Sequence, residues 1–325
     1  MREPVWEFLI VNYLFLGGLS AGLYFASALA TWIQEDGRSA YPRIARWGAL
    51  LAPWPVSLGS ALLILDLGKP FRFWKIFIHF RWRSPMSIGS WLLVAFTILS
   101  LAYLWSWLEQ GERQSLIARI PEKIRTRIPM KVRGWLDLDA STWRRNLAMI
   151  GFPIAVGVGI YTGVLLGAVQ ARPFWNTNLV AQMFLFSALS SGTATLVVAR
   201  LLDREPVELK EMRFLYSMDI TLILLELFIV LPYLIHGELS SLAVKQALAQ
   251  VLGGPFTMVF WVFFMGIGLL LPLVIELVEF KPVILGKGSF HIQPRWALTA
   301  GGLVLFGGYM LRYVFVFAGQ ATGFR

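Results

Sequence analysis

Long stretches without charged side chains dominate this sequence and limit how the protein folds. Five charge-free stretches cover residues 8–34, 47–65, 84–108, 146–171 and 173–199, and three more with isolated charges lie near 216–236, 256–277 and 296–317. A helix needs about 20 largely apolar residues to cross a bilayer. Inside lipid only helices and closed barrels satisfy the backbone, and these stretches are far too long for barrel strands. The sequence therefore predicts an all-α polytopic membrane protein with eight transmembrane helices.

The eight helices are predicted to form a single integral membrane domain over residues 1–325, arranged as two four-helix bundles. Their expected ranges are 8–33, 47–66, 85–108, 147–170, 176–201, 216–236, 256–277 and 296–317. Arg172, Pro173 and two asparagines make a short polar turn between the fourth helix and the fifth. The first helix lacks a small-residue cleavage site at its end, so we expect it to be retained rather than removed as a signal peptide.

Composition supports a membrane protein and bears on which cofactors it can hold. Hydrophobic residues make up 57% of the sequence and charged residues 15%, against about 45–50% and about 25% in soluble domains. The net charge of +10 comes from basic residues between the apolar stretches, which fits anionic lipid headgroups better than nucleic acid. The protein has no cysteine, so an iron–sulfur cluster would have to sit in a partner.

The three histidines argue against haem in this protein. His79 and His291 are expected in loops and His236 at a helix end. A transmembrane b-type haem usually needs paired histidines within helices, so we expect no haem and no other metal site here.

Basic residues in the loops predict the orientation. With the N-terminus outside, the inner loops hold 19 of the 29 Lys and Arg residues and the outer segments hold nine. Because such residues favour the cytoplasmic side, both termini are predicted to be extracytoplasmic, in a multi-pass protein of the cytoplasmic (inner) membrane. The longest inner loop, 109–145, mixes aliphatic residues with cations and is expected to lie on the cytoplasmic leaflet as an amphipathic segment.

One outer loop departs from this charge pattern. Residues 69–85 carry five of the nine outer basic residues, interleaved with Phe and Trp. The loop fits two interpretations: an aromatic belt whose cations reach the headgroups, or a docking face for an extracytoplasmic partner. For the docking face, the expected contact residues are Arg72, Lys75, Arg81 and Arg83.

Polar side chains inside the predicted helices gather toward the outer side. They are Asn12 and Tyr13 on the first helix, Asp66 at the end of the second, Tyr161 on the fourth and Arg312 on the eighth. Polar residues are costly in lipid and usually face the bundle interior. A small amphiphile with two carbonyl oxygens, arriving from lipid, would suit this layer. The same residues also fit interfacial anchors, interhelical hydrogen bonds or a structural ion pair.

Three more acids lie deeper in the predicted helices. Glu226 is in the middle of the sixth helix, and Asp219 and Glu276 lie nearer the inner side. Together with Asp66 they outline a proton route across the membrane, because intramembrane carboxyl groups often relay protons. Pairing with polar groups of neighbouring helices is the alternative.

Five segments of the sequence carry a family resemblance when they are taken together. They are NYLFLGGLSAGLYF at 12–25, LDLGKPFRFW at 65–74, SPMSIGSW at 84–91, YTGVLLGAVQARPFWN at 161–176 and RYVFVFAGQ at 312–320. In this order they resemble the membrane subunits of polysulfide reductase and their NrfD-type relatives, over nearly the whole sequence.

The resemblance implies a function at the outer face. Subunits of that family carry no redox cofactor of their own, anchor a ferredoxin-like iron–sulfur subunit, often with a molybdopterin catalytic subunit, and bind a quinone near the extracytoplasmic side. The substrate implied for this protein is a quinone, either menaquinone or ubiquinone. The family's site uses a polar pair on helix 1 and a tyrosine on helix 4, which correspond to Asn12, Tyr13 and Tyr161. Asp66 corresponds to its acidic residue ahead of the loop between helices 2 and 3; the helix-1 histidine of polysulfide reductase has no counterpart here.

Three functions remain open on the sequence. The leading one is a quinone-binding anchor subunit of a respiratory oxidoreductase complex, which exchanges two electrons and two protons with the quinone pool and an external iron–sulfur partner. An ion-coupled secondary transporter would use the intramembrane acids to bind a coupling ion. A passive membrane anchor would tolerate the loss of Tyr161.

Overall fold

Within the residues that the structure describes, eight helices are long and apolar enough to cross a membrane. The computed structural model describes residues 8–35, 38–66, 74–78, 80–119, 143–286, 290 and 292–322. The spans are α1 (Phe8–Trp32), α2 (Pro42–Leu51) with α3 (Pro53–Leu65), α5 (Pro85–Trp107), α9 (Arg144–Gly167), α10 (Asn178–Leu202), α11 (Leu209–Leu239), the π-helix η3 (Val259–Leu270) with α13 (Leu271–Ile284), and α14 (Pro294–Ala321). The predicted all-α polytopic fold is confirmed.

Shorter elements lie at the ends of these spans. They are β1 (Gln34–Glu35), β2 (Arg38–Ser39), α4 (Lys75–Ile78), α6 (Gln110–Ala118) and α12 (Leu242–Leu252). The two strands pair antiparallel, with Gln34 opposite Ser39. Helix α6 lies within the loop predicted at 109–145, of which residues 120–142 fall outside the described ranges.

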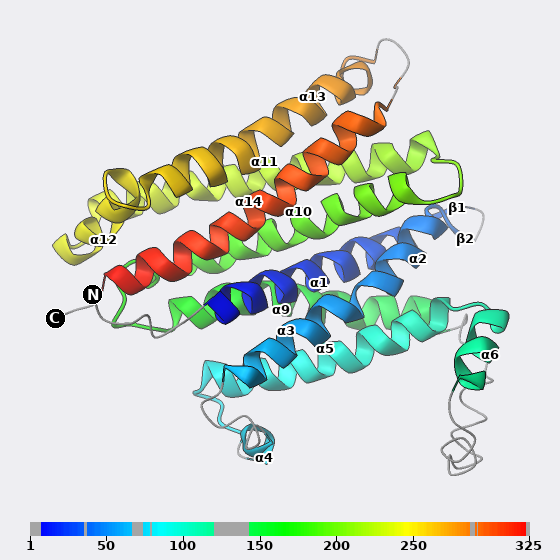
Figure 1. Cartoon of the computed structure of the whole chain (residues 1–325), viewed down its shortest axis with the longest axis horizontal. Helices are drawn as coiled ribbons and strands as arrows, with labels where there is room; N and C mark the ends of the chain where they lie inside the picture. The colour runs from blue at the N-terminus through cyan, green and yellow to red at the C-terminus, as the bar shows by residue number, and fades with distance from the viewer. Residues whose placement is uncertain are drawn as a thin grey trace.

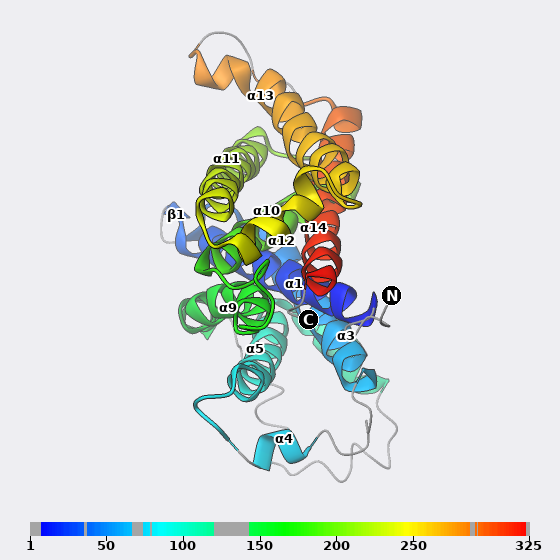
Figure 2. The same cartoon turned by 90° about the vertical axis from the view of Figure 1, so that its left-hand side faces the viewer.

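The helices form two groups of four spans that meet along α1 and α10 (Figures 1 and 2). One group holds α1, α2–α3, α5 and α9, and the other holds α10, α11, η3–α13 and α14. We call them the N-terminal and C-terminal halves. The start of α1 and the end of α14 lie at one end of the molecule, with α4 and α12, toward the left of Figure 1. We call this the terminal end; α6 and the two strands lie at the opposite end.

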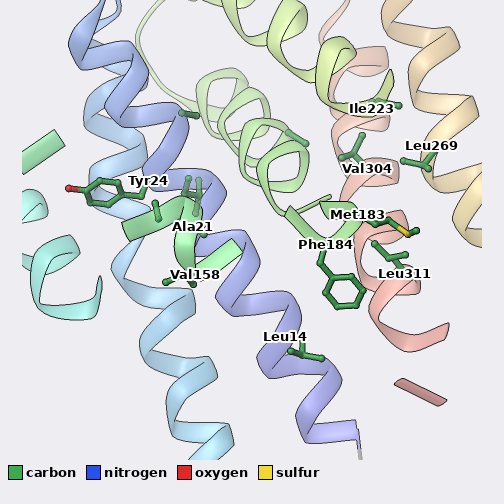
Figure 3. Packing of buried hydrophobic residues seen from close by; sticks show 14 of the residues in the cluster. Leu14, Ala21, Tyr24, Val158, Met183, Phe184, Ile223, Leu269, Val304 and Leu311 are labelled. Carbon is green, nitrogen blue, oxygen red and sulfur yellow. The ribbon is translucent and has the colours of Figure 1, made fainter. Parts of the chain in front are cut away.

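Small residues allow α1 and α10 to cross closely. A Cβ atom at Gly22 would collide with the backbone of Ala188, and one at Gly192 would collide with the backbone of Gly22. Membrane helices associate through such close contacts because lipid supplies no hydrophobic drive between them. Around this crossing, Tyr24 points toward the N-terminal half, and Met183 and Phe184 point toward α14 (Figure 3). The core is thus continuous across the two halves.

Prolines divide the second span. Pro53 and Pro55 supply no N–H to the preceding turn, which breaks the helix between α2 and α3. Hydroxyl groups of α1 tie this region down, since Ser20 donates to the carbonyl of Ala52 and Ser27 donates to that of Ala45 at 2.5 Å. Helix α3 can therefore take its own direction toward the terminal end (Figure 1).

Candidate functional site

Two buried tyrosines meet near the terminal end. Tyr13 of α1 is fully buried and Tyr161 of α9 is 7% exposed. Their phenol groups are close enough to interact. The Tyr13 hydroxyl makes no geometrically regular hydrogen bond to the residues that the structure describes. Because a buried hydroxyl usually finds a partner, the pair offers a donor to a bound molecule.

Glycines of two further helices shape the space around this pair. A Cβ at Gly89 of α5 would occupy the position of the Tyr161 ring, and one at Gly59 of α3 would lie 3.6 Å from the ring of Tyr13. Helix α5 begins at a regular cap, in which Ser84 accepts from the N–H of Ser87. The tyrosine rings therefore pack against α3 and α5 at positions without side chains.

Asn12 and Asp66, two of the other three residues predicted for this layer, also lie at the terminal end. The amide nitrogen of Asn12 donates to the carbonyl of Phe8 at 2.9 Å, so its own helix already satisfies one of its two N–H bonds. Asp66 ends α3 and is partly buried, and its N–H donates to the carbonyl of Leu62 at 3.0 Å. Asp66 and Gly59, which packs on Tyr13, are two helical turns apart. Lys69, the lysine nearest to Asp66 in the sequence, lies outside the described residues.

An apolar groove runs between α3 and α5 beside the tyrosine pair. Its volume is about 410 Å³, within the range of small-molecule pockets. Residues that line it directly follow the two glycines: Ser60 follows Gly59, and Ser90 follows Gly89.

Arg312 lies on the far side of α1 from the tyrosine pair. Its guanidinium is fully buried and donates to the Ser187 hydroxyl at 2.6 Å and to the carbonyls of Gly308 and Phe184 at 2.7 and 3.2 Å. The ring of Phe15 of α1 stands 6.0 Å from it. The structure thus assigns Arg312 to the contact between α14, α10 and α1, rather than beside α3 and α5.

A buried carboxyl faces Arg312. Glu226 of α11 is 1% exposed, and its carboxyl interacts with the guanidinium of Arg312 and with the hydroxyl of Ser187. These three buried polar groups come from three helices, so their contacts help to hold α10, α11 and α14 together.

The remaining predicted acids form a second cluster toward the opposite end. Ser190 of α10 donates to Asp219 at 2.6 Å, and the carboxyl groups of Asp219 and Glu276 lie close enough to interact. Beyond them, Tyr216 donates to Glu279, which also accepts from the backbone N–H of Gln293 at 3.1 Å.

The structure therefore separates Asp66 from the other three predicted proton-path acids. Asp66 ends α3, which packs on α1, α2 and α5 in the N-terminal half. Asp219, Glu226 and Glu276 are buried residues of α11 and α13 in the C-terminal half, and these two helices lie on the opposite side of the molecule from α3 in Figure 1.

The basic aromatic loop presents its described side chains at the terminal end. Lys75, Arg81 and Arg83 are exposed, and Arg72 lies outside the described residues. The rings of Trp74 and Trp82 are 49% and 81% exposed, and Lys75 Nζ stands 5.9 Å from the Trp74 ring. This surface fits both interpretations drawn from the sequence.

Histidines and metal ligands add no further site within the described ranges. His236 is exposed near the end of α11, while His79 and His291 lie outside those ranges. No group of three or more His, Cys, Asp or Glu side chains could hold a metal ion in the part of the protein that the structure describes.

Sequence reasoning missed the groups that connect these residues. The candidates did not include two glycines, two serines and one acid: Gly59, Gly89, Ser187, Ser190 and Glu279. The only signal for the serines is a run of small residues, SALSSGTAT at 187–195, which does not show which hydroxyl faces which acid.

Comparisons with known proteins identify the family. The family model described as "Polysulphide reductase, NrfD" matches residues 1–323. The sequence is 30% identical to one of the polysulfide reductase chains of Wolinella succinogenes, over 97% of this protein and 94% of that one. It is 30% identical to protein NrfD of Escherichia coli, over 98% of this protein and 96% of that one. It is 27% identical to a selenate reductase subunit of Mesobacillus selenatarsenatis, over 90% of this protein and 73% of that one. The protein is an integral multi-pass membrane protein and belongs to the NrfD family of polysulphide reductase membrane subunits.

Proposed function

We propose that this protein is the quinone-binding membrane anchor subunit of a respiratory reductase complex. The relatives it matches include a polysulfide reductase chain and subunits of selenate and tetrathionate reductases. Another relative is the integral membrane subunit of a menaquinol oxidoreductase. These names support a membrane subunit that works with separate catalytic subunits.

The observation that carries the quinone proposal is the buried pair of Tyr13 and Tyr161. A quinone headgroup has two carbonyl oxygens, and donors aimed at the charge that develops on them favour its reduction. The pair lies beside a groove that is open to the membrane interior, the direction from which a lipid-soluble quinone arrives. Asn12 and Asp66 lie at the same end, and we assign Asp66 to proton relay between the site and the surface.

Electrons are proposed to pass between this site and a ferredoxin-like iron–sulfur subunit docked on the terminal end, with a molybdopterin subunit beyond it. The protein has no cysteine, so thiolate-bound clusters belong to the partner. Aromatic and arginine side chains favour the centres of protein interfaces, and Trp74, Trp82, Arg81 and Arg83 supply them at this end. A complex that purifies without any iron–sulfur subunit would contradict this assembly.

The C-terminal half is proposed to carry the proton route predicted from Asp219, Glu226 and Glu276. Ser190, Tyr216 and Glu279 extend it toward the opposite end. Arg312 and Ser187 form the other end of this proposed proton route. That end lies near α1, the helix that carries Tyr13.

A single substitution tests the quinone site. Tyr161→Phe keeps the ring and removes the hydroxyl, and the loss of one donor to a developing oxyanion typically lowers the rate by about 10² to 10³. We expect the quinone-linked turnover of the assembled complex to decrease by a factor in this range. Turnover with an artificial soluble electron carrier should stay normal.

Tyr24→Phe is the matched control, because Tyr24 is also buried on α1 but its hydroxyl donates to the carbonyl of Leu147 at 2.8 Å, away from the pair. Normal quinone kinetics in Tyr161→Phe, with the complex intact, would leave a passive anchor as the better account. Substrate uptake by the protein without partners would favour a transporter.

A further inference from the structure

The groove between α3 and α5 has the shape of a site for an elongated molecule. It follows α5 from Met86 to Ile98, which corresponds to about 18 Å at the rise of an α-helix. It opens toward the membrane at Ile98, which is 64% exposed, and Phe77 of α4 lies at its other end.

The walls of the groove offer little to a polar ligand. Ser57, Ser90 and Thr97 line it, but each hydroxyl donates to a carbonyl four residues earlier in its own helix, at 2.7, 2.8 and 2.7 Å. Their methylene and methyl groups are left to contact an occupant. The Ser60 hydroxyl is buried and has no hydrogen-bond partner among the described residues. The groove thus suits an apolar tail whose polar end lies near Ser60.

The groove lies next to the tyrosine pair, although neither tyrosine lines it. Gly59 and Gly89 contact Tyr13 and Tyr161, and the next residue on each helix, Ser60 and Ser90, lines the groove. If the polar end of a molecule lies between the tyrosines, the rest of the molecule can enter the groove directly, because on each helix the groove begins one residue after the glycine.

We propose that this groove holds the isoprenoid tail of the quinone, so that the site recognises the tail as well as the headgroup. This inference rests on the quinone site proposed above. Bilayer lipid is as apolar as the groove, so an ordinary acyl tail gains no hydrophobic free energy by entering it. A tail joined to a bound headgroup is different, because it is present at a high effective concentration.

The test compares two quinols with the assembled complex in membranes, one with a long isoprenoid tail and one with none. Ala61→Phe and Val94→Phe fill the groove from α3 and α5. Leu58→Phe is the matched control, since Leu58 is 56% exposed on α3 and does not line the groove. We expect the groove variants to lower kcat/KM for the tailed quinol by about tenfold and to leave the tailless quinol unchanged, and the control to change neither.

An equal decrease in kcat/KM for both quinols, or no decrease for either, would overturn the tail assignment. A wild-type complex without quinone-linked turnover would instead contradict the proposed function, and a second measurement then decides on the groove. A quinone with a photoreactive group in its tail should label α3 and α5 of the wild type and of Leu58→Phe but not of Ala61→Phe, and unlabelled tailed quinone should compete. Equal competition by phospholipid would show an ordinary lipid contact and overturn the proposal.

Discussion

Gly89 fixes where the ring of Tyr161 can lie, because the ring occupies the space that a Cβ atom of residue 89 would need. Close positioning matters in such a site, since a displacement of about 1 Å can lower a rate by about 10²-fold. The absence of a side chain on α5 is thus part of the geometry that sets the two phenols against each other.

We expect Gly89→Ala to lower the quinone-linked rate about 10- to 100-fold by displacing the Tyr161 ring. Gly157→Ala is the control on the same α5–α9 contact, where a Cβ would meet only the Leu92 side chain at 3.6 Å, an ordinary contact. Both variants should assemble normally, as judged by co-purification of the partner subunits. Wild-type kinetics in Gly89→Ala would show that Tyr161 works without this constraint.

At the residue scale the sequence predicted the candidates better than their contacts. Tyr13 and Tyr161 could be proposed from their depth and motifs, and the structure brings them together. Arg312 could not be assigned, because an arginine at its depth serves a ligand or a structural pair equally well. Its contacts with Ser187 and Gly308 depend on how α10 and α14 are rotated, which no local pattern encodes.

At the scale of helices, the ends facing away from the termini are tied together by charge. Asp203, just beyond α10, accepts from the indole of Trp47 at 2.8 Å and from the guanidinium of Arg200 at 2.6 Å. Arg200 also pairs with Glu211 of α11 at 2.8 Å. These contacts join α2 of the N-terminal half to α10 and α11.

Asp203 should make this connection sensitive to acid. Partial burial opposes its charge, but the hydrogen bonds from Trp47 and from the backbone N–H of Glu205, together with the Arg200 guanidinium, outweigh it, so the pKa of Asp203 is lowered. A lowered pKa in the folded state stabilises the fold above the unfolded-state pKa of about 3.9, and this contribution is lost as the pH falls through the folded-state pKa.

We expect Asp203→Asn to lower the free energy of unfolding by about 1.5 to 3 kcal/mol at pH 7 and by progressively less below pH 4, as the wild-type carboxyl becomes protonated. Thermal unfolding in detergent across this pH range measures the difference. Glu205→Gln is the control: Glu205 forms an ion pair with Arg43 at 3.3 Å but is 65% exposed, so its loss should cost about 1 kcal/mol or less. A difference that persists unchanged at low pH would contradict this role for Asp203.

Helix number was predictable because the apolar length needed to span lipid is a local property of the sequence. The positions of the helix ends were less predictable. The second span begins at Pro42 and the sixth at Leu209, earlier than the predicted 47 and 216, because both helices continue through charged residues. Glu211 can lie inside a helix and be 1% exposed only because Arg200 pairs with it, a contact between two helices.

At the scale of the whole molecule, the two halves hold different chemistry. The N-terminal half holds the tyrosine pair and the groove, and the C-terminal half holds the buried acids. Helix α1 touches both, since Tyr13 packs beside Gly59 of α3 while a Cβ at Gly18 would lie 3.1 Å from the Arg312 guanidinium. If the proposed assignments hold, mutation should change the quinone chemistry of one half and the proton movement of the other separately.

Asp219→Asn tests this separation with little structural cost, because an amide oxygen can still accept the hydrogen bond from Ser190. Glu226→Gln is less suitable, since it changes the carboxyl group that interacts with the buried guanidinium of Arg312. In proteoliposomes that contain the complete complex, we expect Asp219→Asn to keep quinone-linked turnover when an uncoupler is present but to move fewer protons per electron, because an amide cannot bind and release the proton. Ser191→Ala is the control, since this buried hydroxyl donates to the carbonyl of Ser187 within its own helix. Tyr161→Phe should lower turnover and proton movement together. If Asp219→Asn moves as many protons per electron as the wild type, the acids of the C-terminal half hold helices together and do not carry protons.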